Sequence, residues 1–201
     1  MTRLLPGILA MAAIVAASNI LVQFLFGDWL TWAAFTYPLA FLVTDVTTRL
    51  YGAAAGRKVV LAGFLTGVAC SFVAAGFDAT TFRIALGSGL AFLTAQLIDV
   101  SLFERLRARV WWQAPLASTL VGSTVDTALF FSIAFSARLA WIEPGADTAW
   151  AAEPLPLLGL GPVVPLWVSL AVADWGVKLA LALLALVPFR LIVRQAGRSA
   201  A

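Results

Sequence analysis

The chain has 201 residues, of which 62% are hydrophobic and 11% charged, and its mean hydropathy is +0.98. A soluble domain typically carries about 25% charged residues to cover its surface, so this composition excludes a soluble globular protein and makes lipid the expected solvent. The net charge of +3 would suit nucleic acid, but the positive residues cluster between apolar segments, which is typical of the cytoplasmic loops of a membrane protein.

Six apolar segments have the length of a membrane span, for which a helix needs about 20 apolar residues. We predict a single all-α membrane domain, residues 1–201, with spans at 5–26, 30–48, 59–77, 82–103, 114–139 and 163–188. The segment 142–162 is predicted as a loop that lies on the outer surface or in the interface. Without histidine and with one cysteine, Cys70, the chain has no means for a zinc site, an internal disulfide or a Ser-His-Asp triad, and we expect no metal or cofactor.

The basic residues predict the orientation of the chain. Ten of the thirteen Lys and Arg residues fall on one side of the predicted spans: Arg3, Arg49, Arg57, Lys58, Arg105, Arg107, Arg109, Arg190, Arg194 and Arg198. The other side has Arg83 and Arg138 together with five acidic residues, Asp28, Asp78, Glu143, Asp147 and Glu153. Because positive residues favour the cytoplasmic side, we predict that both termini are cytoplasmic.

Five charged residues lie inside the predicted spans: Asp45, Asp99, Asp126, Asp174 and Lys178. A charge at membrane depth costs at least about 2.5–3.5 kcal/mol, so it persists only where it is paired or faces a polar cavity. Five such charges favour a polar interior that binds or passes a solute. The alternative is that these charges hold the helices together.

Two features single out particular charges. Asp126 lies about 12 residues into its span, or roughly 18 Å, which is close to the middle of the bilayer. Asp174 and Lys178 have i,i+4 spacing with the acid first, the favourable order for an ion pair on one helix. That pair is either a structural salt bridge or a gate that a ligand or proton opens. Trp175 beside it offers a ring for stacking or packs in the core.

Four blocks of sequence form a recognisable set. The first block is Tyr-Pro-Leu-Ala-Phe-Leu-Val-Thr-Asp-Val-Thr-Thr-Arg-Leu-Tyr-Gly at 37–52. The others are 96–107 with Gln96 and Asp99, 111–127 with Trp111, Trp112 and Asp126, and 174–178 with Asp174, Trp175 and Lys178. In this order, the four blocks resemble the queuosine precursor transporter family, also called the vitamin uptake transporter family. The chain departs from many members at Arg49, where they have an acidic residue.

The resemblance implies import of a 7-deazaguanine, preQ0 or preQ1, across the bacterial inner membrane. A carboxylate can accept hydrogen bonds from the ring N–H and the exocyclic amine of such a base together. We therefore predict a substrate site of Asp126, Asp99, Asp45, Trp175, Gln96 and Ser123, with Asp174 and Lys178 as a gating or coupling pair. In this hypothesis Asp126 or Asp99 accepts the hydrogen bonds of the guanine edge.

The expected partners are the deazaguanine and the lipid bilayer, with no direct contact to nucleic acid. The chain could act as a homodimer or together with a separate energising module. In the second case it would be the substrate-binding subunit of a multi-component vitamin uptake system. A less favoured alternative is an intramembrane enzyme in which Asp99 and Asp126 form a catalytic carboxyl pair. We predict a transporter and no enzymatic activity.

Overall fold

The structure is a computed structural model that describes residues 2–199. Seven α-helices make up most of this part of the chain: α1 (Leu5–Leu21), α2 (Ala33–Thr36), α3 (Leu39–Tyr51), α4 (Ala53–Ala75), α5 (Phe82–Leu106), α6 (Gln113–Phe135) and α7 (Leu166–Ser199). Two short antiparallel hairpins accompany them, β1 (Leu25–Phe26) with β2 (Leu30–Thr31), and β3 (Pro154–Pro156) with β4 (Val163–Pro165). Four 3-10 helices complete the elements: η1 (Thr2–Leu4), η2 (Ala137–Ile142), η3 (Ala149–Ala152) and η4 (Leu157–Gly159).

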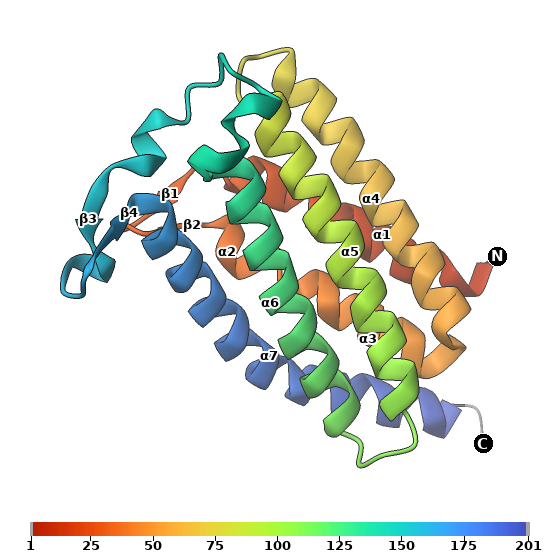
Figure 1. The fold of residues 1–201 in the computed structure, drawn as a ribbon. Coiled ribbons are helices and arrows are strands. Elements are labelled where there is room, and N and C mark those ends of the chain that lie inside the picture. The colour runs from red at the N-terminus through yellow and green to blue at the C-terminus, as the bar shows by residue number, and fades with distance from the viewer. Residues whose placement is uncertain (1, 200–201) are drawn as a thin grey trace.

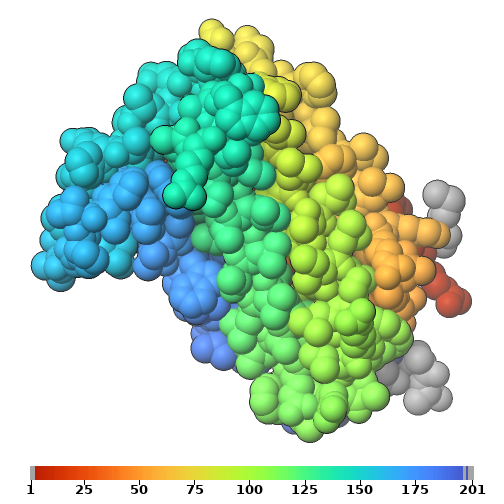
Figure 2. Space-filling view, in the orientation of Figure 1, coloured from red at the N-terminus to blue at the C-terminus, as the bar shows by residue number. Residues whose placement is uncertain are grey.

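Helices α4, α5 and α6 form one layer, and α1, α3 and α7 lie behind it (Figure 1). Helix α3 is central, because it packs against α1, α4, α5, α6 and α7. The side chains of α4, α5 and α6 form a continuous face, and the segment between α6 and α7 projects beyond it at one side (Figure 2). Most of the charged residues described below therefore lie in the interior around α3.

The predicted span 30–48 is wrong as one continuous helix. It begins in strand β2, forms the short α2, and continues as α3 after a break at Tyr37-Pro38. Pro38 has no N–H to donate to the preceding turn, so the ladder of helical hydrogen bonds is interrupted there. The backbone nevertheless stays near helical values at Tyr37 (φ −58°, ψ −39°) and Pro38 (φ −63°, ψ −18°), so the segment is a kinked helix.

Other boundaries also differ from the prediction. Helix α1 ends at Leu21, five residues before the predicted end at 26, and α4 begins at Ala53 where we expected a loop up to residue 58. Gly52 alone separates α3 from α4, with φ +86°, a conformation that glycine adopts without strain. At the other end of the chain, α7 continues through Pro188 to Ser199, past the predicted end at 188.

Three further expectations concern the region near α6 and α7. Helix α6 ends at Phe135, before the predicted end at 139, and α7 begins at Leu166 because Val163–Pro165 is a strand. The predicted loop 142–162 contains η3, β3 and η4, so it is more ordered than its Pro and Gly content suggested. The hydroxyl of Ser169 accepts a hydrogen bond from the N–H of Leu158 at 3.1 Å, which holds this segment against α7.

The prediction of an all-α membrane protein is confirmed for the long helices. In the described chain, four helices are long and apolar enough to cross a membrane: Ala53–Ala75, Phe82–Leu106, Gln113–Phe135 and Leu166–Ala196. Helix α1 is apolar but has 17 residues, and α2 with α3 is kinked. Membrane crossing by α1 and by the kinked segment stays a prediction, as does the position of the termini in the cytoplasm.

Three buried or half-buried arginines join helix ends. At one end of the bundle, Arg49 in the last turn of α3 donates to the carbonyl of Arg107 at 2.7 Å, and Arg107 donates to the carbonyl of Arg49 at 2.9 Å. At the other end, Arg83 in the first turn of α5 is 1% exposed and donates to the carbonyls of Ile133 and Ser136 in and after the last turn of α6. Both arrangements satisfy carbonyls that a helix leaves unpaired at its C-terminus.

Close packing of the helices depends on small residues. A Cβ atom at Gly63 of α4 would lie 2.6 Å from Cγ of Met11 on α1, and one at Gly122 of α6 would lie 2.7 Å from Cε1 of Phe41 on α3. These glycines let neighbouring helices approach to a distance that any larger residue would prevent.

Candidate functional site

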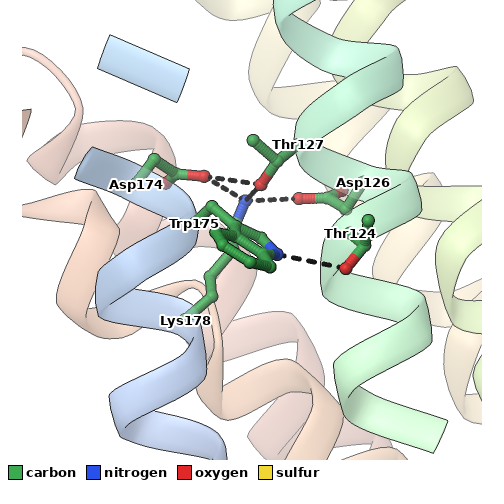
Figure 3. Close-up of polar contacts among 6 residues, drawn as sticks. All are labelled: Thr124, Asp126, Thr127, Asp174, Trp175 and Lys178. Carbon is green, nitrogen blue, oxygen red and sulfur yellow. Dashed lines mark hydrogen bonds and ion pairs between the residues drawn. The ribbon is translucent and has the colours of Figure 1, made fainter. Parts of the chain in front are cut away.

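The most strongly charged feature of the interior is an ion network around the Lys178 ammonium group. Its Nζ atom lies 2.7 Å from Oδ2 of Asp126 and 2.5 Å from Oδ2 of Asp174, and it donates to the Thr127 hydroxyl at 3.0 Å. The Thr127 hydroxyl in turn donates to Asp174 at 2.9 Å. Figure 3 shows the ammonium group surrounded by these three side chains. One cation is therefore held by two carboxylates and a hydroxyl.

The helices explain this arrangement. Asp174 and Lys178 are four residues apart on α7 and lie on one face of that helix, and Asp126 and Thr127 project from the facing side of α6. Lys178 and Asp126 are each 3% exposed, whereas the Asp174 side chain is 17% exposed. Burial of charges in an apolar interior is tolerated because each is paired, and the network ties α6 to α7.

Trp175 covers the network on its outer side. Its indole N–H donates to the Thr124 hydroxyl at 3.0 Å, and its ring stands across the Lys178 side chain (Figure 3). The side chain is 38% exposed. Trp175 is thus a partly exposed lid over Lys178 and a second contact between α6 and α7.

Tyr37 is a further aromatic residue beside the network. Its ring centroid is 5.9 Å from Lys178 Nζ and 5.9 Å from the ring centroid of Phe92 on α5. Tyr37 and Phe92 also line a cavity of about 310 Å³ between α1, α4 and α5. Small-molecule sites in proteins start at about this volume. The Tyr37 ring therefore separates the ion network from a cavity of ligand size.

The cavity is lined mostly by apolar side chains, with a few polar groups among them. Asn19 of α1 contributes an amide, and Ser71, Thr80, Thr81 and Ser88 contribute hydroxyls. Phe72 and Phe82, which are 76% and 62% exposed, lie at its rim where α4 and α5 are joined. An apolar site with a few polar groups suits a flat heterocycle.

A second polar cluster lies deeper in the bundle, toward the end with Arg49 and Arg107. Asp45 of α3 accepts hydrogen bonds from Ser118 at 3.3 Å and Thr119 at 3.1 Å, both on α6. The Asp99 carboxyl of α5 faces the Asp45 carboxyl and the Ser118 hydroxyl. Asp45 is 3% and Asp99 0% exposed. Three helices thus meet at a pair of buried carboxyl groups.

Several buried polar atoms near this pair have no hydrogen-bond partner in the part of the chain that the structure describes. They are both carboxyl oxygens of Asp99, Nε2 of Gln96, and the hydroxyls of Ser123 and Thr48. Gln96 is held at its other end, where Oε1 accepts from Thr44 at 2.7 Å. Gln96 lies one turn from Asp99, and Ser123 one turn from Asp126, so both lie between the carboxyl pair and the ion network.

The predicted site residues therefore fall into two groups. Asp126, Asp174, Trp175 and Lys178 meet in the ion network, whereas Asp45 and Asp99 meet in the second cluster, with Gln96 and Ser123 between the two. The carboxyl pairing of Asp99 with Asp126 that an enzyme would need is wrong, because Asp126 is bound to Lys178 and Asp99 faces Asp45. Among residues 2–199, no group of three or more acidic, Cys or His side chains is arranged to hold a metal ion.

Sequence reasoning missed two residues of the site. Tyr37 was part of the first sequence block but had no assigned role, and its place beside Lys178 depends on the kink that Pro38 makes. Thr127 was one of many hydroxyls on α6, and the i,i+1 position next to Asp126 gave no sign that it would bind Lys178.

Comparisons with known proteins bear on this site. The family model described as "Putative vitamin uptake transporter" matches residues 31–193, which include all residues of both polar clusters. A protein of Escherichia coli K12 named queuosine precursor transporter is 33% identical over 194 residues, covering 87% of this chain and 79% of the relative. No solved structure matches the chain.

Two further relatives are shorter matches. A Haemophilus influenzae protein named probable queuosine precursor transporter is 37% identical over 153 residues, covering 61% of this chain and 65% of the relative. A Bacillus subtilis protein of the same name is 34% identical over 134 residues, covering 55% of this chain and 58% of the relative. With several helices of membrane-spanning length, a charged interior and a family match over most of its length, the chain is a multi-pass membrane protein that belongs to the vitamin uptake transporter family.

Proposed function

We propose that this protein imports queuosine precursors, the 7-deazaguanines preQ0 and preQ1, across the bacterial inner membrane. The observation that carries the proposal is the ion network of Asp126, Asp174 and Lys178 beside a cavity of about 310 Å³ in a member of a transporter family. The names of three relatives, each a queuosine precursor transporter or a probable one, support the choice of cargo.

The ion network has the chemistry that a guanine-like edge requires. One carboxylate can accept from the ring N–H and the exocyclic amine side by side, and such charge-assisted, bidentate bonds are strong and selective in geometry. In the structure both carboxylates are bound by Lys178. In this proposal the base binds Asp126, Lys178 then keeps Asp174 as its partner, and the Asp174–Lys178 pair acts as the gate.

The aromatic side chains supply the flat contacts. Tyr37 and Phe92 line the cavity, and stacking of a base on an aromatic ring contributes about 1–3 kcal/mol in single-strand binders. Trp175 covers the network from the other side. The base therefore passes from the cavity, across Tyr37, to Asp126 in the middle of the bundle. Asp99, Asp45, Gln96 and Ser123 lie along the continuation of this path toward the Arg49 end.

The distribution of charge supports an orientation of the protein in the membrane. The helix ends tied by Arg49 and Arg107 belong to the basic side of the sequence, and Arg190 stacks on Trp111 at 4.5 Å there. We propose that this end is cytoplasmic, that both termini lie on that side, and that α1 and the kinked α2–α3 segment also cross the membrane to give six spans. The cavity rim at Phe72 and Phe82 then lies in the outer half.

The test uses bacterial cells that cannot make the precursors and lack their own importer. These cells are fed low preQ0 or preQ1, with or without this gene, and queuosine in their tRNA is measured. Restoration that depends on the gene supports the proposal, and the dose response ranks the two bases. The Asp126→Asn variant should abolish restoration while the protein remains in the membrane. Absence of restoration with wild-type protein in the membrane would overturn the proposed cargo.

The purified protein in liposomes separates transport by this chain from transport by a larger assembly. Uptake of labelled preQ0 by the chain alone would exclude the need for an energising module. Recovery of the base unchanged inside the vesicles would distinguish a transporter from an intramembrane enzyme.

A further inference from the structure

We propose that the Asp45–Asp99 carboxyl pair holds one proton that enters together with the cargo, so that the protein is a proton-coupled importer. This inference rests on the proposed transport function and adds a second substrate, the proton, with its own site. Its carboxyl groups come from α3 and α5, whereas those of the ion network come from α6 and α7, and among the described residues it has no cation of its own.

Hydrogen-bond accounting shows that the pair lacks a donor. Asp45 receives hydrogen bonds from Ser118 and Thr119. Asp99 receives none on either oxygen from the described residues, although it is fully buried against Asp45. Two ionised carboxylates have only acceptors to offer each other. One proton on Asp99 would supply the missing O–H donor to Asp45 and satisfy both groups.

The surrounding charges do not replace this proton. In the described bundle core, four carboxyl groups, those of Asp45, Asp99, Asp126 and Asp174, share one ammonium group, and that group is bound by Asp126 and Asp174. Two like charges in a water-excluded interior repel each other strongly, so a buried pair without a cation shares a proton, as the carboxyl pair of an aspartic protease does.

Helices α6 and α7 present uncharged groups to the pair. Helix α6 contributes Ser118 and Thr119, and α7 faces Asp45 with apolar side chains that include Leu181 and Ala182. The nearby arginine of α3, Arg49, donates from its guanidinium to the carbonyl of Arg107. The remaining acid near the end of α5, Glu104, is paired with Arg107 and is 40% exposed.

The position of the pair suits transfer of a proton toward the cytoplasm. Asp99 lies seven residues, or about 10 Å, before the end of α5 at Leu106. A void of about 10 Å³ lies beside Asp45 and Thr119, comparable with the space that one water molecule needs. The unpartnered groups of Gln96 and Ser123 lie between the pair and the ion network. Loss of the proton would leave Asp99 in need of a donor, and the unpartnered amide of Gln96, one turn away on α5, is a buried donor on that side.

Proteoliposomes loaded at a fixed pH, with the membrane potential clamped at zero, test the coupling with labelled preQ0, whose charge stays neutral. An inward gradient of one pH unit should drive about tenfold accumulation if one proton moves with each molecule, because a tenfold concentration ratio balances that free energy. External pH should rise when preQ0 is added. The Asp99→Asn variant should equilibrate preQ0 without accumulation and without proton movement.

The matched control is Glu104→Gln, an exposed acid on the same helix, which should accumulate preQ0 like the wild type. A second measurement does not depend on transport. Infrared spectroscopy of the purified protein should show the band of a protonated carboxyl group, and the Asp99→Asn variant should lack that band. Wild-type protein that only equilibrates preQ0 under the gradient would overturn the coupling and leave the cargo intact. Absence of any uptake would overturn the proposed cargo. In that case the infrared measurement still tests the shared proton, and absence of the protonated-carboxyl band would refute it.

Discussion

Arg49 and Arg107 each donate a hydrogen bond from the guanidinium group to the backbone carbonyl of the other, at 2.7 and 2.9 Å. The two residues end α3 and α5, so this reciprocal contact joins the C-termini of two parallel helices. Cations are favourable at helix C-termini, where carbonyls are unpaired. Arg49, the position at which the chain departs from many family members, therefore has a structural role that sequence comparison alone did not suggest.

We predict that Arg49→Ala lowers the thermal unfolding midpoint of the purified protein. Hydrogen bonds to charged groups contribute about 1.5–3 kcal/mol, and the substitution removes the bond that Arg49 donates and leaves the Arg107 carbonyl unpaired. Arg57→Ala is the control, because Arg57 is exposed in the first turns of α4. Equal midpoints for both variants would show that the reciprocal contact contributes nothing to stability.

The second prediction concerns the charge balance of the ion network. In Asp126→Asn, Lys178 keeps Asp174 as a partner, so the protein should fold and lose uptake. In Lys178→Met, two carboxylates face each other without a cation, and breaking a buried pair in this way costs about 3–5 kcal/mol. Detergent unfolding curves should therefore rank Lys178→Met well below Asp126→Asn. A Lys178→Met variant as stable as the wild type would show that the network is not needed for folding.

The third prediction uses two glycines one turn apart on α4. A Cβ atom at Gly63 would lie 2.6 Å from Met11, so Gly63→Ala should push α1 away and reduce stability. A Cβ atom at Gly67 would lie 3.5 Å from Val15, an ordinary contact, so Gly67→Ala should fold and transport normally. Gly67 lines the cavity, and Gly67→Leu should fill it and reduce uptake. Normal uptake by a folded Gly67→Leu protein would remove the cavity from the proposed path.

The fourth prediction separates the ring of Tyr37 from its hydroxyl. Tyr37→Phe keeps the flat wall between the cavity and Lys178 and should retain most uptake. Tyr37→Ala removes that wall and should raise the apparent KM for the base, because a stacked base contributes about 1–3 kcal/mol. Initial rates of labelled preQ0 uptake over a range of concentrations would compare the two. If Tyr37→Phe were as impaired as Tyr37→Ala, the hydroxyl would be the functional group.

The sequence was sufficient to find the charged residues of the interior but not their partners. Charges at membrane depth identified Asp126, and i,i+4 spacing correctly paired Asp174 with Lys178. The bond from Lys178 to Asp126 joins residues 52 positions apart, and it depends on how α6 and α7 are rotated about their axes, which spacing within one helix does not determine.

The same limit explains the boundaries that were wrong. Apolar length predicted the extent of α5 well, but it could not locate the kink at Pro38, because the flanking residues stay apolar and near helical. Apolar length also predicted that the last span ends at Pro188, but α7 continues beyond it. The ring of Phe189 packs edge to face on that of Phe103, with 6.1 Å between the ring centroids. Tertiary contacts compensate there for the hydrogen bond that the proline omits.

The two arginine contacts at opposite ends of α5 restrict how the bundle can rearrange. Arg107 fixes one end of α5 to α3, and Arg83 fixes the other end to α6, so these three helices form a frame whose members separate only if charged hydrogen bonds break. Helix α7 contacts this frame through Lys178 and Trp175 and, further along, through Phe189 on Phe103. Under the proposed function the base takes the place of Lys178 at Asp126, so binding of the cargo itself weakens the contact between α7 and the frame and allows α7 to move.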